Sequence, residues 1–369
     1  MRFSIIYLGL FAVTNLLCSG SAHADFEFGT PTNLGLVVNS SSGESPSCIS
    51  YDGLEMYIDS DRPGQYGNWD IWVSRRPSKD AEWGLPENLG PVINTESEET
   101  LASISADGLT LYFNSNRPDG YGKYDIWMTT RPTKESPWGA PVNLGPPVNS
   151  SDSDGSPWIS ADGLALYFTS MRSGGYGRHD IWVTRRVSED SPWEEPVHLG
   201  SGVNSENSEI YVSVSSDERL LFFSEWYNGP FLPDGYGDAD IWFSTRPTVQ
   251  GDWSTPINMG SNINGPLNDS GARISPDGRT VYFSSERPGG FGGVYGDIYQ
   301  APILPIVDLN SDGIVDAEDM CIMVDNWDTD NPLCDIGPMP WGDGIVDVQD
   351  LIVLAEHLFE EYPPIEPVE

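Results

Sequence analysis

The chain has 369 residues, a formal net charge of −38 and 38% hydrophobic residues. An acidic surface of this kind repels nucleic acid and anionic lipid, which excludes proteins that bind either of them through charge. Four cysteines are too few for a disulfide-held scaffold, whereas the apolar and aromatic residues suffice for a hydrophobic core.

Residues 1–24 have the pattern of a secretory signal peptide. Arg2 is followed by an apolar run from Ile5 to Cys18 and then by small residues that end at Ala24. The run is shorter than the roughly 20 residues that a membrane-spanning helix needs. We therefore expect a protein that is secreted, to the exterior or the periplasm, after cleavage behind Ala24. The loss of Arg2 leaves a net charge of −39.

The rest of the chain is dominated by one repeated phrase. It occurs as "YGNWDIW" at 66–72, "YGKYDIW" at 121–127, "YGRHDIW" at 176–182, "YGDADIW" at 236–242 and, shortened to "YGDIY", at 295–299. A turn aspartate precedes each copy, at Asp52, Asp107, Asp162, Asp217 and Asp277, with steps of 55, 55, 55 and 60 residues. Such a period indicates supersecondary units that bury their faces only against one another.

Each unit predicts four short strands. The first ends before an Asp-Gly turn, and the second is an alternating aromatic segment such as "LTLYFNS". The third begins at "DIW" and runs to an arginine: Arg76, Arg131, Arg186 or Arg246. The fourth carries "WGLPENLG" or its equivalent, in which proline is typical of an edge strand.

The two ends of the repeat region have complementary defects. The fifth unit lacks a fourth strand, whereas "FGTPTNLG" at 28–35 is a fourth strand without a unit. The N-terminal strand can therefore complete the last sheet and close a ring. We predict that residues 25–304 form an all-β, five-bladed β-propeller of four-stranded antiparallel blades.

The repeat "S-x-DG-x-x-LYF-x-S-x-RPGGYG-x-x-DIW" resembles the WD40-like β-propeller repeats of TolB-type periplasmic proteins. The resemblance covers about 270 residues. TolB-type propellers often have six blades, so this chain is one short of that pattern. Blade four also departs from it, because Glu218 replaces the turn glycine and the loop before its "DIW" is five residues longer.

Two features of the repeat are candidates for binding. The first is an acid eight residues before each turn aspartate: Glu44, Glu99, Asp154, Glu209 and Asp269. Five carboxylates around one axis could bind a cation or a basic partner. The alternative is an ordinary ion pair with the arginine that follows the hairpin in four blades: Arg62, Arg117, Arg172 and Arg287.

The second feature is blade four, where Tyr227 replaces this arginine and Glu209 loses its expected partner. The longer loop adds Trp226 and Phe231, which with Tyr227 could stack on sugars or fill a partner's pocket. We take Glu209, Trp226, Tyr227 and Phe231 as the candidate ligand face. No spacing of histidine, serine or cysteine supports catalysis, and the five repeated acids are equivalent, whereas an acid-base pair needs unequal environments.

The C-terminal segment 305–369 contains a calcium-loop pattern, "DLNSDGIVDAED". Oxygen ligands stand at the spacing of an EF-hand loop: Asp308, Asn310, Asp312, Asp316 and Asp319, with the Ile314 carbonyl and a turn at Gly313. A second copy is irregular: Asp343, Ile345, Asp347 and Asp350 fit the later positions, and Asp335 fits as a displaced first ligand. A short amphipathic segment that fits a helix follows each loop.

Two such loops, each with aspartate at position 12 and one following helix, resemble a dockerin domain. The resemblance implies one calcium ion in the first loop, a second in the irregular loop, and docking to a cohesin-like partner. In dockerins of carbohydrate-degrading assemblies, loop positions 10 and 11 often contact the partner. Here these are Ala317, Glu318, Val348 and Gln349. Cys321 and Cys334 flank the segment between the loops and could form a disulfide.

These features favour a secreted binding or scaffold protein that a calcium-loaded module attaches to a partner or surface. The first alternative is a carbohydrate-active enzyme, a glycoside hydrolase or polysaccharide lyase, delivered by the same module for polysaccharide breakdown. The second is a propeller that serves only as a structural spacer.

Overall fold

The computed structural model describes residues 26–226, 235–292, 296–310, 314–329, 331, 334–337 and 345–360. The expected signal peptide, the loop residues Tyr227 and Phe231, and the loop ligands Asp312 and Asp343 lie outside them. No helix among the described residues is both long and apolar enough to cross a membrane.

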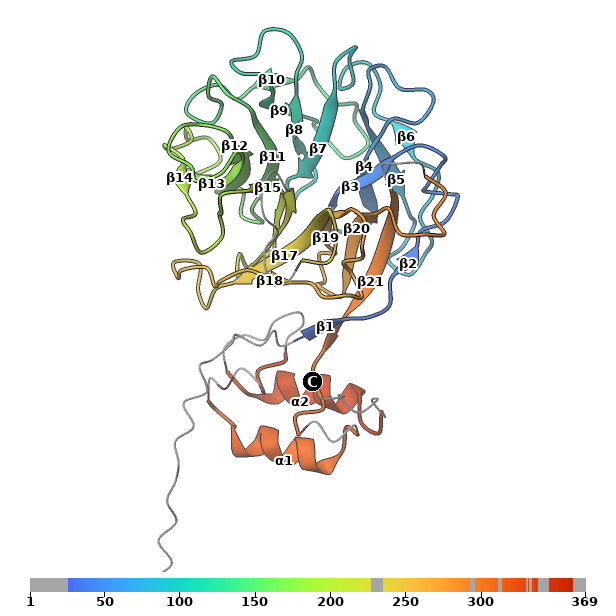
Figure 1. Ribbon diagram of the computed structural model, residues 1–369, viewed down its shortest axis with the longest axis vertical. Helices are drawn as coiled ribbons and strands as arrows, with labels where there is room; N and C mark the ends of the chain where they lie inside the picture. The colour runs from blue at the N-terminus through green and yellow to red at the C-terminus, as the bar shows by residue number, and fades with distance from the viewer. Residues whose placement is uncertain are drawn as a thin grey trace, which may run out of the picture.

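The strands form five antiparallel sheets around a common axis, which confirms a five-bladed propeller (Figure 1). The inner strands are β3 (Glu44–Ile49), β7 (Glu99–Ile104), β11 (Asp154–Ile159), β15 (Ser208–Val214) and β19 (Asp269–Ile274). The second strands are β4 (Glu55–Ser60), β8 (Thr110–Ser115), β12 (Ala165–Ser170), β16 (Leu220–Trp226) and β20 (Thr280–Ser285).

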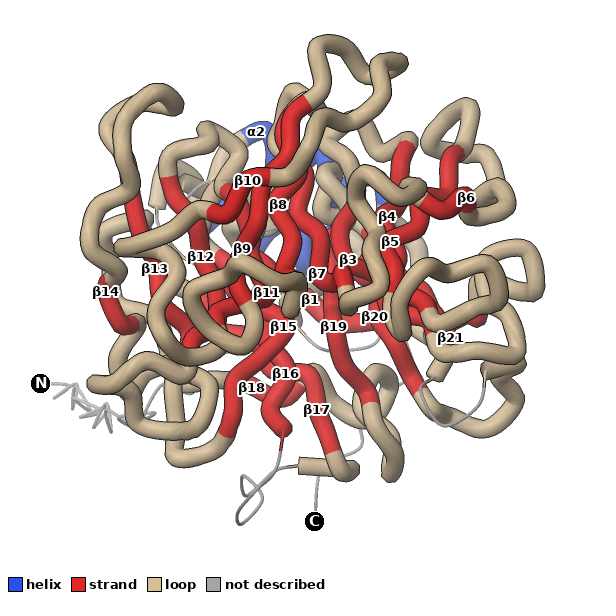
Figure 2. Tube along the Cα trace, turned by 90° about the horizontal axis from the view of Figure 1, so that it is seen from above, coloured by secondary structure: helices blue, strands red, loops and turns tan. Residues whose placement is uncertain are grey.

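The third strands are β5 (Asp70–Arg75), β9 (Asp125–Thr130), β13 (Asp180–Arg185), β17 (Ala239–Thr245) and β21 (Asp297–Pro305). The outer strands at the rim have only two residues each: β6 (Glu87–Asn88), β10 (Val142–Asn143), β14 (Val197–His198), β18 (Ile257–Asn258) and β2 (Thr32–Asn33). In each blade the strands join loops on two opposite faces (Figure 2). We call the face with the Asp-Gly turns the turn face, and the face with the "YG" loops the mouth face.

The N-terminal segment closes the ring as predicted. β2 pairs with β21, with Thr32 opposite Gln300 and Asn33 opposite Tyr299. A further strand, β1 (Phe26–Phe28), pairs with the end of β21 and was not predicted. Both phenylalanines of β1 are buried in the core shared by blades four and five. The first strands of the described chain therefore hold its last blade.

The repeated phrase serves the blade itself. In blade one, the Asp70 carboxylate accepts the Tyr66 and Gly67 amides at 2.7 and 3.1 Å and the Asn88 side chain at 2.7 Å. A Cβ on Gly67 would lie 1.7 Å from the Ser97 carbonyl oxygen, so only glycine fits where this loop meets the next blade. The "DIW" tryptophans are buried, which confirms their structural role.

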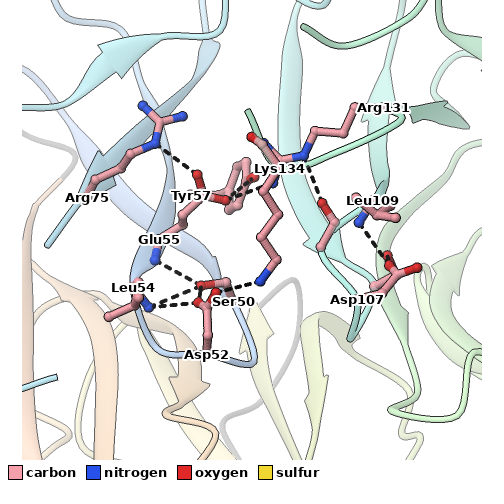
Figure 3. A network of polar contacts seen from close by, with 12 residues as sticks. Ser50, Asp52, Leu54, Glu55, Tyr57, Arg75, Asp107, Leu109, Arg131 and Lys134 are labelled. Atoms are coloured by element: carbon pink, nitrogen blue, oxygen red, sulfur yellow. Dashed lines mark hydrogen bonds and ion pairs between the residues drawn. The ribbon is translucent and has the colours of Figure 1, made fainter. Parts of the chain in front are cut away.

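Charged contacts on the turn face join neighbouring blades (Figure 3). Between blades one and two, Arg131 contacts Glu55 at 3.0 Å and Lys134 contacts Asp52 at 2.6 Å. Glu218 forms the corresponding link between blades three and four, with Arg185 at 2.9 Å and the Tyr167 hydroxyl at 2.6 Å. The residue that departs from the turn pattern in blade four is thus an inter-blade contact.

Beyond β21 the described chain contains two short helices, α1 (Ala317–Asp325) and α2 (Val348–Glu356). They lie together beside the end of β21, apart from the ring (Figure 1). Their small core is separate from those of the blades and consists of Val307, Val315, Met323, Cys334, Ile336, Val346, Val353 and Leu354. Cys334 is buried and Cys321 exposed, and both are free thiols.

Candidate functional site

In four blades, the repeated acids at the start of the inner strands form buried ion pairs. Glu44, Glu99 and Asp154 have no exposed surface, and Asp269 is 1% exposed. Each pairs with the arginine of its own blade at 2.8–3.2 Å, which confirms the ion-pair alternative. These four carboxylates do not present a free charge to a ligand.

A cavity of about 350 Å³ opens instead at the centre of the mouth face. Blades one, two, four and five line it with two kinds of side chain, aromatic or apolar and polar or acidic. They are Ser45, Asp59, Trp69, Glu98, Thr100, Leu101, Tyr211, Trp226, Asn268, Ser270, Ser284 and Glu286. Two tryptophans and three carboxylates at one mouth form a site for a ligand that offers both a flat apolar face and hydrogen-bond donors.

The buried guanidinium of Arg273 joins three blades at the axis. Its side chain is 2% exposed and comes from β19. The guanidinium donates to the carbonyl oxygens of Ser47 in β3, of Tyr211 in β15 at 2.8 Å and of Ala272 at 3.1 Å. Its charge is therefore used within the scaffold.

The inner strands bulge near their mouth ends, and the bulges at Leu101 and Tyr211 lie in the cavity wall. Leu101, Ser156 and Tyr211 have φ of 57°, 48° and 58°, and Gly271 stands at the equivalent place in blade five with φ of 68°. Each lies at a break in the register with the second strand. A bulge re-aims backbone groups, and positive φ in three non-glycine residues costs roughly 1–3 kcal/mol each. The scaffold thus stabilises an unfavourable backbone around the cavity.

Asp59 is the acid in the wall of the cavity that is nearly fully buried, at 2% exposed. It accepts the Ser47 hydroxyl at 2.5 Å and the Leu101 amide at 3.0 Å. Burial raises the pKa of this carboxyl to about 6, although these two hydrogen bonds and the charge of Arg273 favour its ionised form. Asp59 therefore changes charge in a mildly acidic solution.

Asp59→Asn is expected to remove a pH dependence of stability. The pKa of Asp59 is about 6 in the folded chain and 3.8 without the fold, so the folded state binds the proton more tightly. Stability from this group is complete below pH 3.8 and is lost as the pH rises through 6, by about 3 kcal/mol. Urea unfolding of both proteins between pH 4 and 7 should show the stability of the variant, relative to the wild type, rising by most of that amount as the pH increases. A constant difference would contradict the assignment.

The other two acids of the cavity have different surroundings from Asp59. Glu98 accepts a hydrogen bond from the Tyr124 hydroxyl, and burial together with Glu98 raises the pKa of that tyrosine to about 12. Glu286 accepts the Asn268 side chain at 2.8 Å. Both are only half-buried. The three carboxylates of the mouth are therefore chemically unequal, unlike the repeated acids of the inner strands.

The cavity is built at positions that vary from blade to blade. The positions equivalent to Asp59 carry other polar residues: Asn114, Thr169, Ser224 and Ser284. Glu286 is equivalent to Trp226, and Trp69 to Tyr124 and His179. Sequence reasoning missed Asp59, Trp69, Glu98, Tyr211 and Glu286, because the predictions rested on the residues that all blades share. The usable signal was the opposite one, variation at a fixed position of the repeat.

Blade four contributes part of the predicted ligand face to this cavity. Trp226, at the end of β16, is 48% exposed and lies in the cavity wall. Glu209 is 1% exposed and is not among the lining residues. Tyr227 and Phe231 lie outside the described residues, so their part of the prediction stays open.

The two C-terminal loops place equivalent carboxylates in the same way. Asp316 and Asp347 cap α1 and α2, and each cap pairs reciprocally with the aspartate at position 12, Asp319 or Asp350. Asp319 accepts the Leu309 and Asn310 amides at 2.7 and 3.2 Å.

Asp350 accepts the Gly337 amide at 2.7 Å in the same manner. Asn310 and Gly337 thus take equivalent places in the two loops. Asp308 lies two residues before Asn310, and Asp335 lies two residues before Gly337, so Asp335 is the counterpart of Asp308.

The donors that the structure describes are of the type that calcium prefers. Asp308, Asn310, Asp316, Asp319 and the Ile314 carbonyl offer only oxygen in the first loop, and Asp335, Ile345, Asp347 and Asp350 do so in the second. Asp319 and Asp350 have no exposed surface. Within the described ranges, no group of three or more His, Cys, Asp or Glu is close enough to hold a metal. The donor chemistry fits calcium, whereas a gathered ligand set is not seen there.

No family model and no curated protein matches the chain. Among solved structures, it is similar to the α-L-arabinofuranosidase PaAbf62A of Podospora anserina in complex with cellotriose, with 13% identity, 76% of this chain and 98% of that chain covered, and a TM-score of 0.51. This likeness shows a shared fold.

Likenesses to two TolB proteins are weaker. A putative TolB of Agrobacterium tumefaciens is 18% identical, over 70% of this chain and 73% of that one, with a TM-score of 0.40. TolB of Acinetobacter baumannii is 14% identical over 72% of this chain, which spans 56% of that protein, with a TM-score of 0.43.

Proposed function

We propose that the protein is a secreted carbohydrate-binding protein whose propeller holds a glycan in the mouth cavity. The observation that carries this proposal is the asymmetry of the cavity. A ring of nearly identical blades places two tryptophans, a tyrosine and three unequal carboxylates at one opening. A spacer would need only the repeated residues, whereas a binding site needs the variable ones.

The chemistry of the cavity wall selects the class of ligand. Carboxylates accept hydrogen bonds from hydroxyl groups, and tryptophan rings pack against the apolar face of a sugar ring. The lining residues include no lysine, arginine or histidine, and the chain has a net charge of −38. A neutral glycan therefore suits the cavity better than an anionic one.

Trp69→Ala and Trp226→Ala are each expected to weaken glycan binding at least tenfold, because each removes a ring from the wall of the cavity. A glycan array with the full secreted chain identifies the ligand, and titration calorimetry measures its affinity for each variant. Trp327→Ala is the matched control, since Trp327 is 38% exposed beyond the propeller. Unchanged affinity in both cavity variants would favour the spacer alternative.

A glycoside hydrolase is the second candidate, favoured by the unequal carboxylates. Burial raises the pKa of Asp59 to about 6, and a poised acid beside carboxylates in other surroundings is what glycoside hydrolysis requires. The arabinofuranosidase of similar fold is a carbohydrate-active enzyme. New reducing ends in a polysaccharide incubated with the wild type, but not with Asp59→Asn, would establish hydrolysis. Binding without new chain ends would support the binding protein.

We further propose that the C-terminal module binds calcium and docks to a cohesin-like partner. Bound calcium would link the first and last residues of each loop and so fix the following helix. Ala317, Glu318, Val348 and Gln349 begin the two helices and are exposed, as residues that contact a partner must be. A panel of cohesin domains, tested with calcium and with EDTA, would detect such docking, and binding that ignores EDTA would contradict it.

Asp308→Ala is expected to remove one calcium ion and to lower the calcium-dependent increase in stability of the module. The reason is that Asp308 supplies the first ligand of the regular loop. Protection of residues 305–360 from proteolysis, with and without calcium, measures the effect. Asp325→Ala, at the exposed end of α1, should behave as the wild type. Equal protection of all three proteins in EDTA and in calcium would contradict a structural calcium site.

A further inference from the structure

Four blades carry an internal cation at the mouth end of the inner strand. In blade one, the Arg62 Nη2 atom lies 3.1 Å from Glu44 Oε1 and donates to the Val38 carbonyl at 2.8 Å. The Ser60 hydroxyl donates to the same Glu44 oxygen at 3.2 Å. Blades two, three and five repeat the arrangement with Arg117, Arg172 and Arg287.

Blade four replaces both partners of the acid. Glu225 stands where the other blades have serine, and Tyr227 stands in the sequence where they have arginine. Glu225 lies directly across the β15–β16 pair from Glu209. Glu209 and Glu225 are 1% and 0% exposed, so two carboxylates are buried side by side where the other blades have one carboxylate and one cation.

Hydrogen bonds reach only two of the four carboxylate oxygens of this pair. The Ser205 hydroxyl lies 2.5 Å from Glu209 Oε1 and 3.3 Å from Glu225 Oε1, but it has a single hydrogen to donate. Asn207 donates to Glu225 Oε1 at 2.5 Å. The Oε2 atoms of both glutamates are buried without a hydrogen-bond partner. A buried carboxylate oxygen without a partner is costly, so the site requires a further positive group.

The surrounding charges do not supply that group. The nearest further charges are negative as well, since Asp180 acts on Glu209 and Asp240 acts on Glu225. Among the described residues, no lysine, arginine or histidine forms an ion pair with either glutamate. The two carboxylates must therefore share a proton or bind a cation from solution.

We propose that the Glu209–Glu225 pair binds a calcium ion, which takes the part that arginine has in the other four blades. The donors are the two Oε2 atoms and the Val203 carbonyl, which is equivalent to the Val38 carbonyl that Arg62 contacts in blade one. All are oxygens, and hard oxygen donors with two carboxylates suit calcium rather than a transition metal. This site is independent of the C-terminal loops.

Restoring the pattern of the other blades tests the proposal. The double substitution Glu225→Ser and Tyr227→Arg supplies an internal cation, so the full chain should bind one calcium ion fewer than the wild type in native mass spectrometry. The C-terminal loops are identical in both proteins and contribute equally. Equal calcium counts would overturn the proposal. So would a wild type whose melting temperature in EDTA already equals that in calcium, because the pair would then hold a proton.

Single substitutions keep the test valid if the double variant folds poorly. Glu209→Gln retains the size of the side chain and should weaken this calcium ion at least tenfold in a titration. Glu44→Gln is the matched control, because blade one has Arg62 in place of a metal ion, and it should leave the calcium count unchanged. Loss of one ion in both variants, or in neither, would contradict a site specific to blade four.

Discussion

Phe28→Ala is expected to lower the free energy of unfolding by about 3–5 kcal/mol. Phe28 is 7% exposed, and its ring lies 6.4 Å from that of Phe222 and 6.3 Å from that of Phe243, both in blade four. Its backbone pairs with Ile303 in blade five. The side chain thus fixes the strand that closes the ring against two blades, and a cavity there weakens the contact between the two ends of the repeat region.

Phe291→Ala is the matched control, because Phe291 is 42% exposed on a loop of the last blade. It should cost less than about 1 kcal/mol. Urea unfolding followed by tryptophan fluorescence compares the two variants. Equal losses of stability, or a Phe28 variant as stable as the wild type, would show that the N-terminal segment does not close the ring.

Arg273→Ala is expected to destabilise the chain by about 3–5 kcal/mol. The guanidinium donates to carbonyl groups of β3, β15 and β19, so its substitution removes a hydrogen bond from acceptors in three blades at the centre. The substitution also removes the positive charge that lowers the pKa of Asp59. The pKa of Asp59 should therefore rise further in the variant, which a pH series of unfolding curves detects.

Arg279→Ala provides the comparison within the same blade, since Arg279 is exposed in the Asp-Gly turn. A loss of less than about 1 kcal/mol is expected there. Arg273→Lys keeps the charge but cannot span three carbonyl groups, so it should fall between the wild type and Arg273→Ala. A neutral effect of Arg273→Ala would mean that the contacts between blades at the centre contribute little to stability.

Much of the fold could be predicted because the repeat shows which four strands make up each blade. The N-terminal segment is a fourth strand without a unit, and the fifth unit lacks a fourth strand. Every sheet is complete only if the two pair, and β2 does pair with the sheet of the fifth unit. The strand β1 could not be predicted in this way. Its residues Phe26 and Glu27 precede the repeated segment, which begins at Phe28, and the place of the strand depends on the apolar surface that blades four and five leave uncovered.

The candidate site was less accessible to sequence reasoning. Repeated acids such as Glu44 attract attention, but their spacing from an arginine also predicts the buried ion pair that they form. Asp59 stands at a position where the other blades have small polar residues without a charge. Nothing in the local sequence indicates that its strand borders a cavity. That information comes from the ring, which brings Asp59, Glu98 and Trp226 from three blades to one opening.

The most direct test of the proposed function is a crystal structure of the full secreted chain with an oligosaccharide selected by the glycan array. Sugar density packed against Trp69 or Trp226, with hydroxyl groups within hydrogen-bond distance of Asp59, Glu98 or Glu286, is the predicted result. A sugar bound on the turn face, or on the C-terminal helices, would contradict the assignment of the mouth cavity.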